Sequence, residues 1–173
     1  MRDSSQQISV LFVCLGNICR SPMAEGVFRQ VVADAGLSHR FRIDSSGTGS
    51  WHVGRPPDIR AQQALAVRGI DISNQRARQF TRDDFKAFDL ILAMDRSNYD
   101  RLHALAPDVY EPNIRLFMKY APEMGACEIP DPFFGGPEGF DYVLNLIEVA
   151  SRGLLASVIK EESMLAEPYA RSG

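Results

Sequence analysis

The chain has 173 residues, of which 45% are hydrophobic and 24% are charged, and this composition is typical of a single globular domain with a substantial core. It carries 19 Lys and Arg against 22 Asp and Glu, a formal net charge of −3, which argues against nucleic acid as a partner because such proteins carry a basic excess. The three cysteines are too few and too odd in number for the disulfide framework of a secreted domain, so we expect a reduced, cytoplasmic setting.

Apolar periodicity predicts strands that alternate with helices. The β-branched run Ser9–Val13 is typical of a strand buried on both faces. It is far too short to span a membrane, so we expect no membrane partner. A helix is predicted to begin at Ser21, a good N-cap, with Pro22 in its first turn, and to end at Gly36. Later segments predict strands at 41–45, 88–94 and 114–118, and helices at 58–68, 95–106 and 138–159.

This alternation is typical of an α/β fold, a parallel sheet with helices on both faces. We expect one domain at residues 8–160. A flexible polar N-terminus at 1–7 precedes it, and a loose C-terminal tail at 161–173 follows it, because the helical periodicity ends there.

The loop after the first strand carries the most informative motif. It reads Cys14-Leu15-Gly16-Asn17-Ile18-Cys19-Arg20-Ser21 and joins the carboxyl end of a strand to the amino end of a helix. Open α/β sheets bind ligands at that place. Successive backbone N–H groups form a nest for phosphate oxygens, and Gly16 lets the backbone curl tightly. The sequence therefore predicts a phosphate-binding loop.

Three side chains of this loop fit nucleophilic attack on phosphorus. The helix N-terminus stabilises the thiolate of Cys14. The guanidinium of Arg20 matches two phosphate oxygens. The hydroxyl of Ser21 can donate a hydrogen bond to the sulfur.

Phosphoryl transfer to sulfur also needs an acid for the departing oxygen, and Asp131 is the best candidate. Pro132 restricts its backbone to an extended conformation, and Phe133 and Phe134 would line a pocket for a flat substrate. The alternative interpretation is that Asp131-Pro132 is only a turn.

The segment 10–25, VLFVCLGNICRSPMAE, resembles the active-site signature of low-molecular-weight protein tyrosine phosphatases. Asp131-Pro132 resembles the general-acid loop of that family, and 44–48 and 89–95 also fit its sequence. The resemblance covers about residues 8–160. It implies a four-stranded parallel sheet and an enzyme that needs no metal and no organic cofactor. The histidines show no metal-ligand spacing and are expected on the surface or in packing roles: His39, His52 and His103.

The resemblance also implies a role for each site residue. Cys14 would form a phosphocysteine, and Asp131 would protonate the leaving phenolate of a tyrosine-phosphorylated protein. Asn17 would hold the strained turn of the loop, and Ser21 would stabilise the thiolate. The loop would bind phosphate-like anions through its backbone N–H groups and the Arg20 side chain. The residues of this phosphate-binding loop are Leu15, Gly16, Asn17, Ile18, Cys19 and Arg20. We expect a monomer or a weak dimer.

Some positions depart from the family or stay open. The lone Trp51 belongs either to the core or to one wall of the substrate cleft. Phe133 and Phe134 replace tyrosines that the family often has, so regulation by phosphorylation of those positions does not transfer. Gln75 replaces a histidine that braces the loop through a serine, expected here to be Ser46. Glutamine can donate a hydrogen bond but cannot titrate.

The other two cysteines carry less information. Cys19 is either a small packed thiol or, as the resemblance implies, a redox residue that forms a disulfide with oxidised Cys14 and prevents overoxidation. Cys127 has no assigned role.

Three other functions fit the same scaffold. Arsenate reductases relay a disulfide through further cysteines, but none lies between residues 20 and 126. Arginine phosphatases carry threonine at the position of Ile18, whose apolar side chain favours a phenyl ring. An inactive phosphoprotein-binding module would be expected to lack the nucleophile or the acid, and both Cys14 and Asp131 are present. Phosphotyrosine is therefore the predicted substrate.

Overall fold

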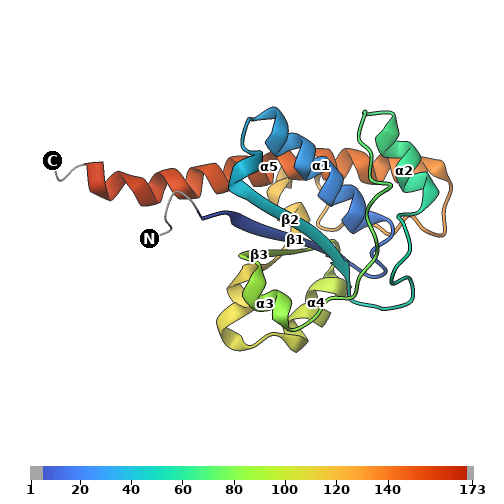
Figure 1. The fold of residues 1–173 in the computed structure, drawn as a ribbon, viewed down its shortest axis with the longest axis horizontal. Helices are drawn as coiled ribbons and strands as arrows, with labels where there is room; N and C mark the ends of the chain where they lie inside the picture. Colours follow the sequence, from blue (N-terminus) through green and yellow to red (C-terminus); the bar gives the residue numbers. More distant parts are fainter. Residues whose placement is uncertain (1–5, 171–173) are drawn as a thin grey trace.

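The computed structural model describes residues 6–170, and for 166–170 only the backbone. A parallel sheet of four strands in the order β2-β1-β3-β4 forms the centre of the molecule (Figure 1). This confirms the predicted fold class. The strands are β1 (Ile8–Cys14), β2 (Phe41–Gly47), β3 (Leu90–Ala93) and β4 (Ile114–Leu116).

Strand β1 is buried on both faces, as its β-branched sequence predicts. Val10 and Phe12 pack into one hydrophobic cluster, whereas Leu11 and Val13 pack into a second one. Because successive side chains of a strand point to opposite faces, this alternation shows that a helical layer covers each face of the sheet.

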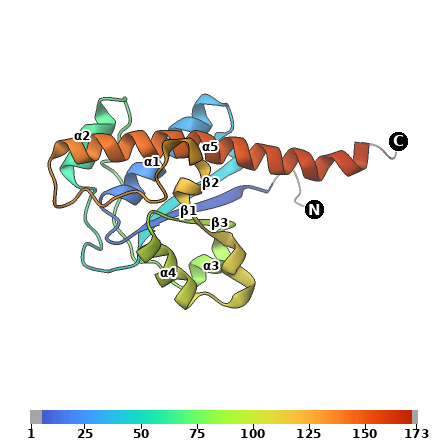
Figure 2. The same cartoon turned by 180° about the vertical axis from the view of Figure 1, so that it is seen from behind.

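Figures 1 and 2 show the two layers. On one face α1 (Arg20–Asp34) and α5 (Pro137–Ala170) pack on the sheet and on each other, and α2 (Ile59–Ala66) packs against both helices. On the other face lie α3 (Asp83–Ala87) and α4 (Arg96–Leu105). Short 3₁₀ turns occupy Ser38–Arg40, Asp108–Asn113, Phe117–Tyr120 and Pro122–Met124.

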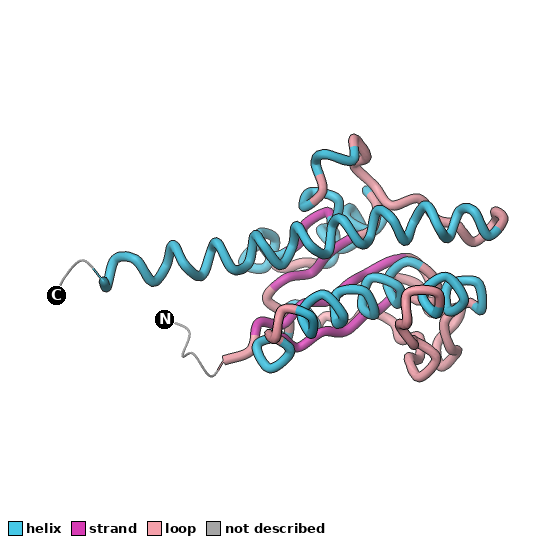
Figure 3. Tube along the Cα trace, turned by 90° about the horizontal axis from the view of Figure 1, so that it is seen from above, coloured by secondary structure: helices cyan, strands magenta, loops and turns pink. Residues whose placement is uncertain are grey.

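Helix α5 is longer than its sequence pattern predicts. It continues to Ala170, whereas the sequence pattern predicts a helix that ends at residue 159 and a loose tail from residue 161. Figure 3 shows this end of α5 extending past the sheet. Between residues 159 and 165 no side chain is buried, and this explains why the apolar periodicity fades there although the backbone stays helical. The predicted flexible segment 1–7 lies largely outside the described residues.

By length and composition alone, α5 is also apolar enough to cross a membrane, with a mean hydropathy of 1.4 in its most apolar window. Half of that window is buried inside the molecule. The side chains that make it apolar are core residues, among them Phe140, Val143, Leu144, Ile147 and Leu154. The hydropathy of α5 is thus explained by its packing on the sheet.

Other boundaries differ from the sequence prediction by a few residues. Helix α1 begins at Arg20 with Cys19 at the N-cap position, so Ser21 is not the N-cap. Asp58 and Asp95 are N-caps rather than first residues of α2 and α4. The short helix α3 was not predicted, since five residues are too few to establish a helical period.

Candidate active site

The loop that leaves β1 is held in a strained turn by Asn17. This residue has φ = 56°, in the left-handed region that asparagine tolerates better than most residues. Its Nδ2 donates to Ser21 Oγ at 2.8 Å and to Ser45 Oγ at 3.0 Å, and its Oδ1 accepts from the backbone N of Arg78 at 3.0 Å. These three bonds fix the loop to α1, β2 and the segment after α2.

The nucleophile candidate Cys14 is buried and faces hydrogen-bond donors. Its Sγ accepts from the backbone N–H of Asn17 at 3.3 Å and lies 3.0 Å from Ser21 Oγ. Ser21 Oγ can instead donate to the carbonyl of Ser46 at 3.3 Å. The single hydroxyl proton of Ser21 can therefore turn toward sulfur when Cys14 is a thiolate, and toward Ser46 when Cys14 is protonated.

The end of β2 approaches the loop closely enough to require glycine. A Cβ on Gly47 would lie 2.7 Å from the carbonyl oxygen of Leu15 and 3.0 Å from the backbone N of Asn17. The next residues continue the contact, because the N–H of Thr48 donates to Cys14 O and that of Gly49 donates to Leu15 O. The loop is thus rigidly backed by β2.

Arg20 is 2% exposed and is oriented by partners from two other segments. One of its Nη atoms donates to Asp95 Oδ2 at 2.6 Å and to the carbonyl of Ile129 at 3.0 Å. Burial alone would lower the pKa of the Arg20 guanidinium, but the neighbouring Cys14 and Asp95 raise it above its ordinary value. A permanently charged guanidinium is therefore fixed beside the sulfur. Asp95 is not among the site residues predicted from the sequence, although its place after a strand end was a usable indication.

The acid candidate Asp131 lies near the Nη atom of Arg20 that does not bond Asp95. Its Oδ2 is 3.7 Å from the second Nη of Arg20, and its Oδ1 accepts from the N–H of Phe133 at 3.1 Å. The side chain is 38% exposed. Asp131 is thus placed near the guanidinium and remains open to solvent.

One cavity of about 130 Å³ brings together the predicted nucleophile, the loop, the acid and the aromatic residues. Trp51 is 69% exposed at its rim, so it is not a core residue, and Phe134 is 93% exposed. The lining residues are Cys14, Leu15, Gly16, Ile18, Cys19, Arg20, Trp51, His52, Asp131, Phe133 and Phe134.

His52 is a residue of this cavity that the sequence analysis missed. Its ring lies against the loop, since a Cβ on Gly16 would be 2.9 Å from His52 Cδ2. Its ring centroid is 6.3 Å from that of Phe133. Adjacency to Trp51 was the only indication in the sequence.

The predicted brace through Ser46 is wrong in its details. Gln75 donates to the carbonyl of Pro22 at 3.1 Å, and the buried hydroxyl of Ser46 has no partner. The hydroxyl that supports Asn17 belongs to Ser45. Ser45 pairs with Phe12 in the register of β1 and β2, and Phe12 faces the cluster under α1. The alternation of the strand therefore puts Ser45, and not Ser46, on the side of the loop and α1.

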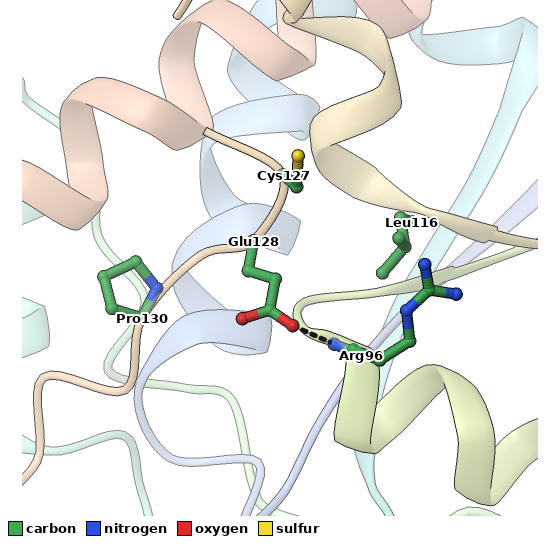
Figure 4. Close-up of a pocket in the computed structure, with 5 residues that line it drawn as sticks. All are labelled: Arg96, Leu116, Cys127, Glu128 and Pro130. Atoms are coloured by element: carbon green, nitrogen blue, oxygen red, sulfur yellow. Dashed lines mark hydrogen bonds between the residues drawn. The ribbon is translucent and has the colours of Figure 1, made fainter. Parts of the chain in front are cut away.

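The other two cysteines lie in different environments. Cys19 is buried beside Cys14 in the same cavity, and burial raises the pKa of its thiol, with Asp58 and Cys14 adding to the effect. Cys127 is exposed and lines a separate cavity of about 340 Å³ with Arg96, Leu116, Glu128 and Pro130 (Figure 4). Within residues 6–165, whose side chains are described, no group of three His, Cys, Asp or Glu is arranged to hold a metal ion.

A family model, low molecular weight phosphotyrosine protein phosphatase, matches residues 9–164 of this chain. The chain belongs to this family. A phosphatase of that name from Schizosaccharomyces pombe is 46% identical over 156 residues, which cover 89% of this chain and 99% of the relative.

Solved structures support the same assignment. A protein tyrosine phosphatase from Entamoeba histolytica, with Hepes in its active site, superposes with a TM-score of 0.88 at 36% identity, covering 90% of this chain and 99% of its own. A Drosophila arginine phosphatase superposes with a TM-score of 0.79, also at 36% identity, covering 86% and 96%. The chain is therefore a hydrolase of the protein tyrosine phosphatase class, built on a scaffold that an arginine phosphatase shares.

Proposed function

We propose that this protein hydrolyses phosphotyrosine in proteins through a phosphocysteine on Cys14. The observation that supports it best is the placement of a buried sulfur, a fixed guanidinium and a solvent-accessible carboxyl around one cavity, at Cys14, Arg20 and Asp131. The site lies at the carboxyl edge of the sheet, where the loop amides and the N-terminus of α1 favour an anion.

In the first step the Cys14 thiolate attacks phosphorus. An S–P bond forms, the P–O bond to the tyrosine ring breaks, and Asp131 gives its proton to the departing phenolate. Arg20 and the loop N–H groups hold the equatorial oxygens as charge develops. In the second step Asp131 takes a proton from water, the water oxygen attacks phosphorus, and the S–P bond breaks to release phosphate and the thiolate.

An arginine phosphatase is the second candidate, favoured by the likeness to the Drosophila structure. Ile18 argues for tyrosine, because its apolar side chain lines the cavity, where it suits a phenyl ring better than a guanidinium. Rates on phosphotyrosine, phosphoarginine and phosphoserine peptides discriminate between the two. We expect phosphotyrosine to be hydrolysed fastest, and a preference for phosphoarginine would contradict the proposal.

The chemistry is tested by two variants with aryl phosphates. Cys14→Ser should abolish hydrolysis of p-nitrophenyl phosphate while vanadate still binds, because the loop amides and Arg20 remain. Asp131→Ala should slow cleavage by about 10²–10⁴-fold, most for poor leaving groups. Unchanged rates across all leaving groups would show that another group is the acid. We further propose a cytoplasmic monomer or weak dimer.

A further inference from the structure

Arg60, in the first turn of α2, bonds the loop that carries the acid candidate. Its two Nη atoms donate to the carbonyls of Gly135 and Phe133, each at 3.0 Å. Its guanidinium carbon also lies 4.6 Å from the ring centroid of Phe140 and 5.7 Å from that of Phe133. One side chain thus holds residues 133–135 by two hydrogen bonds and one cation–π contact, and the second cation–π contact packs it against Phe140 of α5.

The backbone of Phe133 connects Arg60 to Asp131. Its N–H donates to Asp131 Oδ1 at 3.1 Å, while its C=O accepts from Arg60. Among the described residues, the one other polar contact of the Asp131 carboxyl is its 3.7 Å approach to Arg20. The position of the exposed carboxyl therefore depends on Phe133, the residue whose carbonyl Arg60 holds.

Asp58 fixes Arg60 from the other side. Its carboxylate accepts from Arg60 Nε at 3.0 Å and from an Nη at 2.9 Å, and it caps α2 through the backbone N of Arg60. Because Arg60 donates to it, the pKa of Asp58 lies below its usual range, so the pair stays ionised near neutral pH. The backbone N–H of Asp58 donates to the carbonyl of Ile18, in the phosphate loop, at 2.8 Å.

A continuous path therefore runs from the phosphate loop through Asp58 and Arg60 to the acid loop. We infer that Arg60 is a positioning residue that sets the distance and direction of Asp131 relative to the substrate oxygen. This inference rests on the proposed function, since it assumes that Asp131 is the acid. Arg60 itself is absent from the residues that line the cavity.

The test is the dependence of kcat/KM on the acidity of the leaving phenol, measured with aryl phosphates from p-nitrophenyl to phenyl phosphate. In Arg60→Met the phenyl ester should lose about 10- to 100-fold, the cost of a small misplacement of a catalytic group. The nitrophenyl ester should lose much less, because its leaving group needs little protonation. A plot of log kcat/KM against the acidity of the leaving phenol therefore becomes steeper. Inhibition by vanadate, which needs no acid, stays the same.

Two further variants complete the series, and a third variant serves as its control. Arg60→Lys keeps the charge but not the fork of donors and should lie between wild type and Arg60→Met. Asp58→Asn should steepen the plot in the same direction. The control is Arg68→Met, because Arg68 follows the same helix but, among the described residues, its side chain donates only to Glu148 of α5. Its plot should keep the wild-type slope.

The outcomes separate the two proposals. If Asp131→Ala steepens the plot but Arg60→Met lowers all rates equally or not at all, the inference about Arg60 is overturned and Asp131 stays the acid. If Asp131→Ala leaves the slope unchanged, both the acid assignment and the inference fall. Thermal unfolding of each variant accompanies the kinetics.

Discussion

Cys19 has a neutral thiol in a loop that otherwise favours anions. Its burial and the nearby carboxylate of Asp58 raise the pKa of this thiol, so Cys19 is a poor nucleophile at rest. The sulfur of Cys14, in contrast, accepts from the N–H of Asn17 and lies 3.0 Å from Ser21 Oγ. The redox role of Cys19 stays a prediction. This role requires that the Cys19 sulfur react with Cys14 only after Cys14 has been oxidised, and that it not react with other electrophiles.

We expect that role to be visible as recovery after peroxide. Peroxide would oxidise the Cys14 thiolate to a sulfenic acid, and attack by the Cys19 sulfur with loss of water would leave a disulfide. Dithiothreitol should then restore most of the activity of the wild type and little of the activity of Cys19→Ala. Mass spectrometry of the oxidised protein provides the second measurement. Equal recovery of the two proteins would contradict the prediction.

Glu25 connects the interior of α1 to the phosphate loop. Its Oε1 accepts from Ser45 Oγ at 3.0 Å, and Ser45 in turn accepts from Asn17. Burial raises the pKa of Glu25 above its ordinary value, and Asp44 adds to this, whereas Arg29 and Ser45 lower it. The carboxyl of Glu25, with its raised pKa, is thus connected to the turn of the phosphate loop by two hydrogen bonds, through Ser45 to Asn17.

The raised pKa has a stability consequence with a definite sign. Above the ordinary pKa of 4.5 the unfolded chain has lost a proton that native Glu25 keeps, so the native state binds more protons and the free energy of unfolding falls as pH rises through the native pKa. Glu25→Gln keeps an acceptor for Ser45 and should remove this dependence. Urea unfolding from pH 4 to 8 should therefore favour the variant increasingly at higher pH.

Arg29→Met serves as the complementary variant in that series. Without the attraction of the Arg29 guanidinium, which lowers the pKa of Glu25, the fall in stability with rising pH should become larger than in the wild type. A wild type and a Glu25→Gln variant with parallel pH profiles would show that Glu25 keeps its ordinary pKa.

At the scale of elements, strong apolar periodicity predicts the helices and strands well. Contacts between distant segments cannot be predicted from it. The four strands and the long helices follow from local runs such as Ser9–Val13. The strand after Asp89 is only four residues long, and Phe117–Tyr120 turns into a 3₁₀ segment, because tertiary packing ends each strand earlier than its apolar run. The predicted nucleophile, arginine, acid and aromatic residues do line one cavity.

The partners of those residues were harder to predict. The carbonyl of Ile129 and the choice of Ser45 over Ser46 depend on register and on the path of a loop. The sequence contains no local pattern for either of them. Arg60 is likewise an ordinary helical arginine until the acid loop lies beside it.

The packing of α5 gives a prediction at this scale. A Cβ on Gly153 would lie 1.9 Å from the carbonyl oxygen of Tyr120, so Gly153→Ala must push α5 away from the turn at Phe117–Tyr120. We expect a loss of about 1–3 kcal/mol in the free energy of unfolding, which lowers Tm by about 2–4 °C for each kcal/mol.

Gly139, in the same helix, provides the matched control. A Cβ there would lie 3.6 Å from Pro132 Cβ, an ordinary contact. Gly139→Ala should therefore be neutral or stabilising by up to about 1 kcal/mol, from helix propensity. Equal melting temperatures for the two alanine variants would show that α5 can shift freely over the turn.

At the scale of the whole molecule, the site is a meeting point of loops at the carboxyl edge of a parallel sheet. Neighbouring strands β1 and β3 lead into helices on opposite faces, α1 and α4, and the loops part there to leave room for a ligand (Figure 1). The phosphate loop is thus placed by strand order, and the acid loop reaches it from the far end of the chain.

The distance along the chain between Arg20 and its partners has a consequence for biosynthesis. Asp95 and Ile129 follow Arg20 by 75 and 109 residues. A ribosome therefore makes the reactive cysteine and its arginine long before the groups that orient them, and contacts of such separation form late. Until residue 131 has emerged and docked, the growing chain holds the proposed nucleophile without the proposed acid. In the proposed mechanism, full hydrolytic activity therefore requires that the acid loop has docked beside the phosphate loop.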